Sequence, residues 1–510
     1  MNDVITKQVT EKEFLKYCSQ MTDGGFMEKQ TRSIAEKQFV AYLREEEGVY
    51  LNYYKNTGEL TIVSEKESKY FSFFDKSEAV SVSPQITQLH LEDFGMSYVI
   101  RLSDGRYIVI DGGRELEPDA DRLMECLRDG AENRKPIIAA WIMTHPHTDH
   151  YYCFFPFIEK YREEIVIEKF LFNFPEADDM EHYPKLIPAV YREEGHTANP
   201  KMLQFLEIVK ELSVQVYTPH TGQIYQIGDA VLEILACMDD TISNSNDVNA
   251  TSLVIRMELG GQVILWATDA SFHWTHMKER YGTCLKADIL QVPHHGFGHY
   301  GTGMGQEADI QNTMDAYKLI SPKVCLLPAS DYSVFTAKSI FLKCVNYLMT
   351  ECGVQELITG EHTRTLTLPY KADVHGAEKL HNQILAGMEN AGARTWIFTE
   401  LDTSRPEDFQ YTILNTTHNT EAEIWIDLFF EDEKSRICFI KATVSHCSLK
   451  KICIIDKEDV ETNAFLYNGR SLEKKGVPEA VPFAIRFMSN IPVVVSNKHH
   501  EASYLSLIHI

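Results

Sequence analysis

The stretch WIMTHPHTDHYYCF (residues 141–154) joins an apolar run to three histidines and one aspartate that lie within six residues. Imidazole nitrogens and carboxylate oxygens are the ligands that divalent zinc takes in catalytic sites. An apolar run that ends at such groups is typical of a buried strand in an α/β domain, where the loops beyond the strands carry function. The stretch therefore predicts a metal site at the end of a buried strand.

Three further segments repeat this pattern of an apolar run that stops at acidic or imidazole groups. RYIVIDGG reaches Asp111, GQVILWATDA reaches Asp269, and ADILQVPHHG ends at His294 and His295. Each segment alone would indicate only a turn or loop residue. If the four strand ends lie at one edge of the packed sheets, their polar groups converge on a single site.

The spacing of the histidines suits two metal ions. His145 and His147 can reach one ion from the same side of an extended loop. Asp149 and His150 begin a short helix and can serve a second ion. Asp269 carries an acceptor-only carboxylate that can bridge both ions.

The adjacent pair His294 and His295 supplies the remaining groups. His294 is expected to complete the second metal site. His295 is the candidate for protonating the leaving group or binding an oxyanion, and the alternative is a hydrogen bond to a metal ligand. The predicted catalytic residues are Asp149 and His295, and the predicted metal ligands are His145, His147, Asp149, His150, Asp269 and His294.

These motifs resemble the metallo-β-lactamase fold of dinuclear hydrolases, and most closely the hydrolase domain of competence-type DNA-uptake proteins. The resemblance rests on THPHTDH, NATSLV (residues 249–254), WATD (266–269) and DILQVPHHG (288–296), and it spans roughly 86–370. It implies a four-layer αββα sandwich. Many members have a third metal-binding histidine that this sequence lacks, so Asp239, Asp240, Asn249 or water are the alternatives for that position.

The C-terminal part resembles the soluble transducer of sensory rhodopsins. The segments RTWIFTELDT (394–403), FQYTILNTTHNTEAEIWIDLFFED (409–432) and PFAIRFMSNIPVVVSN (482–497) carry this resemblance. It implies a small all-β sandwich that associates into homo-oligomers. The alternative is a generic β-sandwich accessory domain.

The chain is thus expected to be an α/β hydrolase domain followed by an all-β domain. Residues 11–47 are predicted to be helical, and residues 50–63 are predicted to form a hairpin around Gly58. The last six residues, LSLIHI, read as a sequencing or cloning scar. The predicted parts are an N-terminal helical and hairpin segment at 1–75, the hydrolase domain at 76–371, a connecting helix at 372–393, the β-sandwich at 394–504 and the scar at 505–510.

Charge and composition narrow the function further. Lys and Arg total 49 against 74 Asp and Glu, which gives a formal net charge of −25. This balance disfavours long nucleic acids, whose binding relies on clustered Lys and Arg. The 11 cysteines form no C-x-x-C pair, and no segment is apolar enough to span a membrane, so a cytoplasmic protein without a membrane partner is expected.

Together these observations predict a metal-dependent hydrolase with two zinc ions, or manganese as the alternative metal. A metal-activated hydroxide would attack a small phosphodiester or another ester. The alternative is a non-catalytic sensor or scaffold that binds a metal or ligand and signals through its C-terminal β-sandwich.

Overall fold

The computed structural model describes residues 3–34, 36–70, 75, 82–93, 95–131, 134–245, 248–297, 307–329, 344, 348, 351–374 and strands between 394 and 497. The chain divides into two compact units. Unit 1 comprises Met1–Ser330 and Cys352–Ala372, and unit 2 comprises Asp331–Glu351 and Asp373–Ile510. The predicted scar at 505–510 and residues 375–393 of the predicted connecting helix lie outside the described residues.

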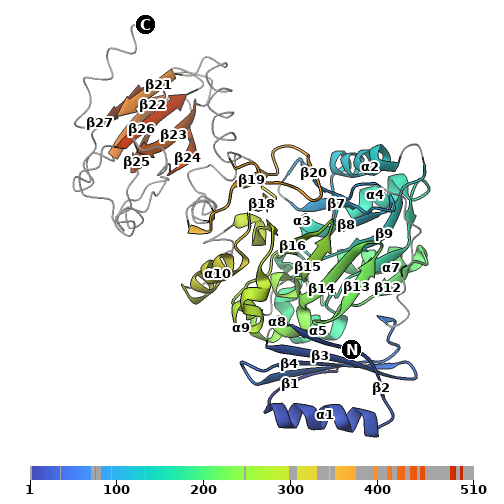
Figure 1. Ribbon diagram of the computed structural model, residues 1–510. Helices are drawn as coiled ribbons and strands as arrows, with labels where there is room; N and C mark the ends of the chain where they lie inside the picture. Colours follow the sequence, from blue (N-terminus) through green and yellow to red (C-terminus); the bar gives the residue numbers. More distant parts are fainter. Residues whose placement is uncertain are drawn as a thin grey trace. The chain divides into compact units, whose positions relative to one another are not determined.

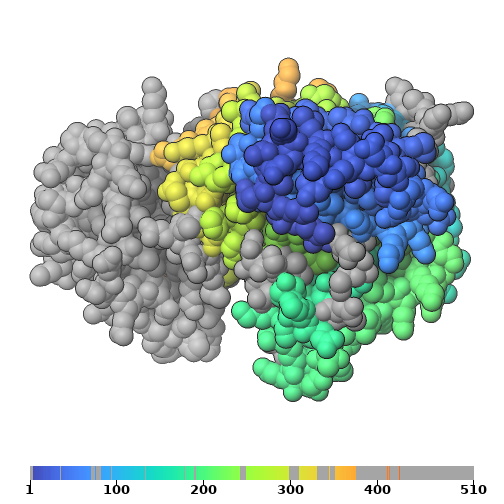
Figure 2. All heavy atoms as spheres, turned by 90° about the horizontal axis from the view of Figure 1, so that it is seen from below, coloured from blue at the N-terminus to red at the C-terminus, as the bar shows by residue number. Residues whose placement is uncertain are grey.

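Unit 1 begins with a five-stranded antiparallel sheet in the order β1-β5-β4-β3-β2. Thr10 caps the single helix of this region, and the Glu13 side chain accepts a hydrogen bond from the Thr10 N–H. In Figure 1 the sheet lies between this helix and the rest of unit 1, and Figure 2 shows the blue N-terminal residues spread over the face turned toward the viewer. The elements are β1 Asp3–Gln8, α1 Glu11–Asp23, β2 Met27–Ile34, β3 Lys37–Arg44, β4 Glu47–Tyr54 and β5 Glu59–Glu65.

The expected hairpin is confirmed, because β4 and β5 pair antiparallel on either side of Gly58. The expected helix over 11–47 is wrong beyond Asp23, because two strands follow it. One face of β3 packs on Phe14 through Val40 and Tyr42, whereas its other face belongs to a second buried cluster. A strand buried on both faces lacks the alternation that identifies a strand from sequence.

A second sheet carries the first half of the predicted site. Its order is β12-β11-β9-β8-β7-β6-β20, with β10 beside β9. Strands β8, β9, β11 and β12 are parallel, so their carboxyl ends lie at one edge. The strands are β6 Gln85–Gln88, β7 Ser97–Arg101, β8 Tyr107–Asp111, β9 Ile137–Ile142, β10 Val166–Ile167, β11 Lys169–Leu171, β12 Gln215–Tyr217 and β20 Arg364–Thr367.

A third sheet carries the second half of the predicted site. Its strand order is β13-β14-β15-β16-β17-β18-β19. Strands β16 to β19 are parallel, so the residues that follow β16 and β17 also leave the sheet at one edge. The strands are β13 Ile224–Ile227, β14 Ala230–Ala236, β15 Val254–Leu259, β16 Gln262–Trp266, β17 Ile289–Gln291, β18 Val324–Leu327 and β19 Glu356–Thr359.

The main core lies between the second and third sheets. Ile100 and Ile110 of one sheet share a buried cluster with Ile234 and Trp266 of the other. A second buried cluster joins the outer face of the eight-stranded sheet to α2, α4 and α7. The mixed α/β class is thereby confirmed. The helices are α2 Glu117–Ala131, α3 Thr148–Tyr151, α4 Phe154–Tyr161, α5 Ala177–His182, α6 Ala189–Glu193, α7 Pro200–Glu211, α8 Met238–Ser245, α9 Met277–Tyr281 and α10 Glu307–Ile320, with short 3-10 turns at η2 Pro184–Leu186, η3 Val248–Thr251, η4 Gly282–Leu285 and η5 Pro293–Gly296.

From residue 394 onward, the described residues of unit 2 form two sheets. A four-stranded sheet has the order β21-β26-β23-β24, and a three-stranded sheet has the order β25-β22-β27. The rings of Tyr411 and Phe487, one from each sheet, lie 4.6 Å apart and are buried. The strands are β21 Arg394–Phe398, β22 Gln410–Asn415, β23 Ala422–Phe430, β24 Ile437–Val444, β25 Ser448–Cys453, β26 Phe483–Ser489 and β27 Val494–Asn497.

Among the helices described in either unit, none has the length and apolar character needed to cross a bilayer.

Candidate metal centre

The first ligand group contains His145, His147 and Asp269, whose ligand atoms all lie within 4.8 Å of one another. His145 and His147 follow β9, and Asp269 follows β16, so the group joins two sheets. His145 is buried, whereas the His147 side chain is 39% exposed. His145 Nε2, His147 Nδ1 and Asp269 Oδ1 are buried atoms without a hydrogen-bond partner in the described part of the chain. Buried polar atoms are rarely left in this state, and a divalent cation would satisfy all three.

The second ligand group contains Asp149, His150 and His295. His295 Nε2 lies 3.2 Å from Asp149 Oδ2 and 3.3 Å from His150 Nε2. All three residues are buried. Two imidazole nitrogens and a carboxylate oxygen at these distances are ligand types that zinc accepts, so this group also fits a metal ion.

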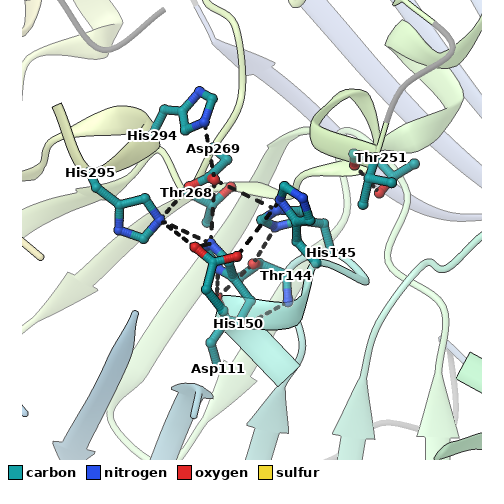
Figure 3. Close-up of polar contacts among 12 residues, drawn as sticks. Asp111, Thr144, His145, His150, Thr251, Thr268, Asp269, His294 and His295 are labelled. Carbon is teal, nitrogen blue, oxygen red and sulfur yellow. Dashed lines mark hydrogen bonds and ion pairs between the residues drawn. The ribbon is translucent and has the colours of Figure 1, made fainter. Parts of the chain in front are cut away.

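Asp269 lies between the two groups (Figure 3). Its Oδ2 is 3.8 Å from His145 Nε2 and 3.3 Å from His150 Nε2, and its Oδ1 is 3.6 Å from His295 Nε2. One carboxylate therefore approaches imidazoles of both groups. This is the arrangement that a bridging ligand requires.

Asp111 anchors the loop under the site. Its carboxylate accepts hydrogen bonds from Thr144 N at 2.8 Å, Thr144 Oγ1 at 2.7 Å and His150 Nδ1 at 2.7 Å. Thr144 Oγ1 donates its hydrogen to Asp111, so it accepts from His145 Nδ1 at 3.1 Å. His295 Nδ1 in turn lies 3.1 Å from the carbonyl oxygen of Pro328, which can only accept.

These contacts assign the tautomers of three histidines. Because His145, His150 and His295 each carry a proton on Nδ1, Nε2 is the atom that each turns toward Asp269 or its neighbours. Hydrogen bonds of this kind orient histidines for metal binding and increase their basicity. Sequence reasoning missed Thr144 and the Pro328 carbonyl, although Thr144 directly precedes the first histidine of the motif.

The backbone around the site adopts the left-handed region at four residues that are not glycine. Asp111, Thr268, His294 and His295 have φ angles of 55°, 50°, 50° and 54°. His294 N donates to Thr268 O at 2.7 Å, and Thr268 Oγ1 donates to Leu253 O at 2.8 Å, which holds two of these turns together. Such strained residues cluster at functional sites.

The carboxylates and histidines of the site shift one another's pKa values. Burial disfavours the charged form of His150, yet Asp269, Asp149 and Asp111 raise its pKa well above the usual value. Despite burial, the neighbouring histidines hold the pKa values of Asp149 and Asp269 well below the usual range. Burial and the neighbouring His150 lower the pKa of His145. The low pKa values of Asp149 and Asp269 keep two carboxylates ionised beside the histidines, and ionised carboxylates favour cation binding.

The structure brings together the predicted residues with one exchange. The second group contains His295 where His294 was expected. His294 Nε2 lies 3.8 Å from Asp269 Oδ2, and its side chain is 18% exposed.

The alternatives for the missing third histidine occupy different surroundings. Asp239 Oδ2 contacts His220 Nδ1 at 2.6 Å, and Asp240 Oδ1 accepts from Arg280 at 2.8 Å. Asn249 lies in η3, four residues before Leu253, whose N–H donates to the Thr144 carbonyl oxygen at 3.1 Å.

A family model described as the metallo-beta-lactamase superfamily matches residues 91–228. Among solved structures, the metallo-beta-lactamase fold protein YhfI from Bacillus subtilis is 13% identical, with 55% of this chain and 87% of that chain covered and a TM-score of 0.28. CmlA, a diiron beta-hydroxylase from Streptomyces venezuelae, is 13% identical, with 57% and 55% covered and a TM-score of 0.35.

An Anabaena sensory rhodopsin transducer gives a partial match, at 21% identity over 21% of this chain and 84% of that chain, with a TM-score of 0.15. No curated protein matches the chain. The finer resemblance to competence-type DNA-uptake hydrolases stays a prediction. The chain contains a metallo-beta-lactamase superfamily domain, matched at residues 91–228, with buried groups of His and Asp side chains that could bind metal.

Proposed function

We propose that this chain is a metal-dependent hydrolase that cleaves a phosphodiester or another ester. The observation that carries the proposal is the position of Asp269, whose carboxylate lies 3.3–3.8 Å from imidazole nitrogens of both ligand groups. Divalent ions bound at such a site lower the pKa of a water ligand and stabilise negative charge in the transition state. Zinc suits these His and carboxylate ligands, and manganese is the alternative.

The chain's own residues would supply the ligands of two ions. His145 and His147 hold one ion, whereas Asp149, His150 and His295 hold the other. Asp269 is the ligand common to both ions. Asp111 and Thr144 act through the histidines, because their hydrogen bonds fix the Nε2 atoms toward the site.

His294 takes the substrate-facing role that the sequence suggested for His295. Its imidazole is partly exposed and its Nε2 lies 3.8 Å from Asp269. A side chain in this position can donate a hydrogen bond to a leaving group or oxyanion beside the ions. His295 is fully buried among the ligands and is proposed as a ligand instead.

The substrate class follows from charge. A formal net charge of −25 disfavours a long polyanion, so a small phosphodiester or cyclic ester is the better candidate. The test is a panel of chromogenic phosphodiesters, lactones and β-lactams, each assayed with zinc and with manganese. Turnover of phosphodiesters or lactones supports the proposal, and turnover of β-lactams alone contradicts the proposed substrate class.

A matched pair of variants ties that turnover to the site. His145→Ala removes a buried ligand and should abolish turnover. His182→Ala changes an exposed histidine on α5 and should leave turnover as in the parent. Equal rates in both variants would show that the measured activity does not come from this site.

The competing function is a sensor or scaffold that binds metal without turnover. The observation that favours it is the composition of the first group, which has two histidines and one aspartate among the described residues. Metal binding with no hydrolysis of any panel member would support the scaffold.

We also propose that the chain forms homo-oligomers through its C-terminal β-strands. Light scattering of the full chain tests this proposal separately.

A further inference from the structure

A third cluster of metal-binding side chains lies outside the proposed catalytic site. It consists of His220, Cys237 and Asp239, whose ligand atoms all lie within 4.8 Å of one another. His220 and Cys237 are completely buried. The cluster shares no residue with the two groups around Asp269, and the proposed hydrolysis makes no use of it.

The three side chains reach one place from separate elements. His220 follows β12, Cys237 follows β14, and Asp239 lies in the first turn of α8. Asp239 Oδ2 is the focal atom, at 2.6 Å from His220 Nδ1, 3.3 Å from Cys237 Sγ and 3.5 Å from Asn173 Nδ2. One oxygen atom thus faces an imidazole nitrogen and a thiol sulfur at close range.

We propose that His220, Cys237 and Asp239 bind a structural zinc ion. Thiolate, imidazole and carboxylate are the three ligand types that zinc accepts. Zinc–ligand bonds of about 2.0–2.3 Å in a tetrahedron place ligand atoms roughly 3.3–3.7 Å apart. The Cys237–Asp239 distance of 3.3 Å already meets this spacing. His220 Nδ1 and Asp239 Oδ2, now 2.6 Å apart, would separate by roughly 1 Å.

Binding exchanges protons for the metal. The ion displaces the Cys237 thiol proton and the Nδ1 proton that a protonated His220 shares with the Asp239 carboxylate, which leaves a thiolate, a neutral imidazole and a carboxylate as ligands. Thr221 Oγ1 lies 3.5 Å from Cys237 Sγ and donates to Asp240, so a water molecule would fill the fourth position of the zinc ion. The proton balance is then two protons released for one zinc ion bound.

The cluster supports the surface on which the N-terminal sheet lies. The Tyr50 ring stacks on His220 with ring centroids 5.6 Å apart, and Asn52 Nδ2 donates to Thr221 O at 2.6 Å. Both residues belong to β4. A zinc ion would fix the loop that carries His220 to α8, and so hold the docking surface of the N-terminal sheet in one conformation. The role is structural, and it does not depend on the proposed hydrolase activity.

Cobalt is the probe, because it replaces zinc and gives thiolate ligands a visible signature. The full-length protein is produced in cobalt-supplemented minimal medium, so that buried sites fill during folding. The His and Asp groups around Asp269 contain no thiol, so a near-ultraviolet thiolate-to-cobalt charge-transfer band reports on Cys237. We expect this band in the parent protein. Its absence there, with cobalt present at the other site, overturns the proposal.

Two cysteine variants locate the signal. Cys237→Ser keeps the size of the side chain and a donor for Asp239, and it should remove the band together with about one metal ion per chain. Cys153→Ser, at a cysteine buried among the side chains of another cluster, should keep both. A band that survives in Cys237→Ser, or that disappears in Cys153→Ser, contradicts the assignment. Neither readout requires turnover, so failure of the proposed hydrolase function leaves this test intact.

Discussion

Replacing Asp111 by Asn tests whether hydrogen bonds to the Asp111 carboxylate orient His150 of the second ligand group. Asp111 is fully buried, and its carboxylate accepts three hydrogen bonds of 2.7–2.8 Å from Thr144 and His150. Asn tolerates the φ angle of 55° at this position, so the backbone can be retained. Carboxylate oxygen Oδ2, however, becomes an amide nitrogen that cannot accept the hydrogens of Thr144 Oγ1 and His150 Nδ1.

The magnitude follows from the two donors that lose this acceptor. Each buried donor without a partner costs about 1–3 kcal/mol, so the free energy of unfolding should fall by about 2–6 kcal/mol. Loss of the residue that orients a metal-binding histidine typically lowers metal affinity about 10–100-fold. The two effects should appear together in Asp111→Asn.

The assays are urea unfolding for stability and competition with a chromogenic chelator for metal affinity. Asp104→Asn is the matched control, because Asp104 lies before the other end of β8 and pairs with Arg106 at 2.7–2.9 Å. This control should lose stability and keep the metal affinity of the parent. If Asp111→Asn behaves as the control does, the reasoning that Asp111 orients His150 is refuted.

Three further predictions concern separate parts of unit 1. Asp269→Asn should lower metal affinity roughly a thousandfold, because one unit charge at about 4 Å is worth about 4 kcal/mol; retention of full metal content and turnover would exclude a bridging role. Burial lowers the pKa of Lys37 to about 8 from 10.5, so Lys37→Met should be more stable than the parent by up to about 3 kcal/mol at pH 7. That stability advantage of Lys37→Met should shrink as pH rises from 8 to 10.5, because in this range the unfolded parent keeps a proton that the folded parent has released. A difference in urea unfolding that does not change with pH would contradict the claim that Lys37 is buried with a lowered pKa. Gly222→Ala should be strongly destabilising in thermal melting, because its φ is +93° and the added Cβ would meet atoms of the N-terminal sheet at 2.3 and 2.4 Å. Gly195→Ala, where φ is +85° and nothing lies within 4 Å, isolates the backbone strain, and equal losses in both variants would show that close packing at Gly222 is unimportant.

The ligand-bearing strand ends could be predicted because their signal is local. The apolar runs before His145 and Asp269 form β9 and β16, and the polar residues that follow them meet at the edge of the sheets. The choice between His294 and His295 could not be predicted, since neighbouring residues in a turn point different ways according to backbone angles that the sequence pattern does not encode.

Long-range packing accounts for the rest. Strand β3 lacks a polar face because α1 covers one side and the rest of unit 1 covers the other, so its pattern did not distinguish strand from helix. The cluster of His220, Cys237 and Asp239 arises only when the β13–β14 hairpin returns the chain to the end of β12. No short motif in the sequence indicates it.

The central claim, a two-metal hydrolytic site built around Asp269, is tested most directly by metal analysis and turnover of the Cys237→Ser variant, in which the third cluster cannot contribute a thiolate ligand. The account predicts about two metal ions per chain and hydrolysis of a small ester that stops when a chelator removes them. One ion or none per chain after purification without chelator, or two ions without turnover of any ester in the panel, would contradict it.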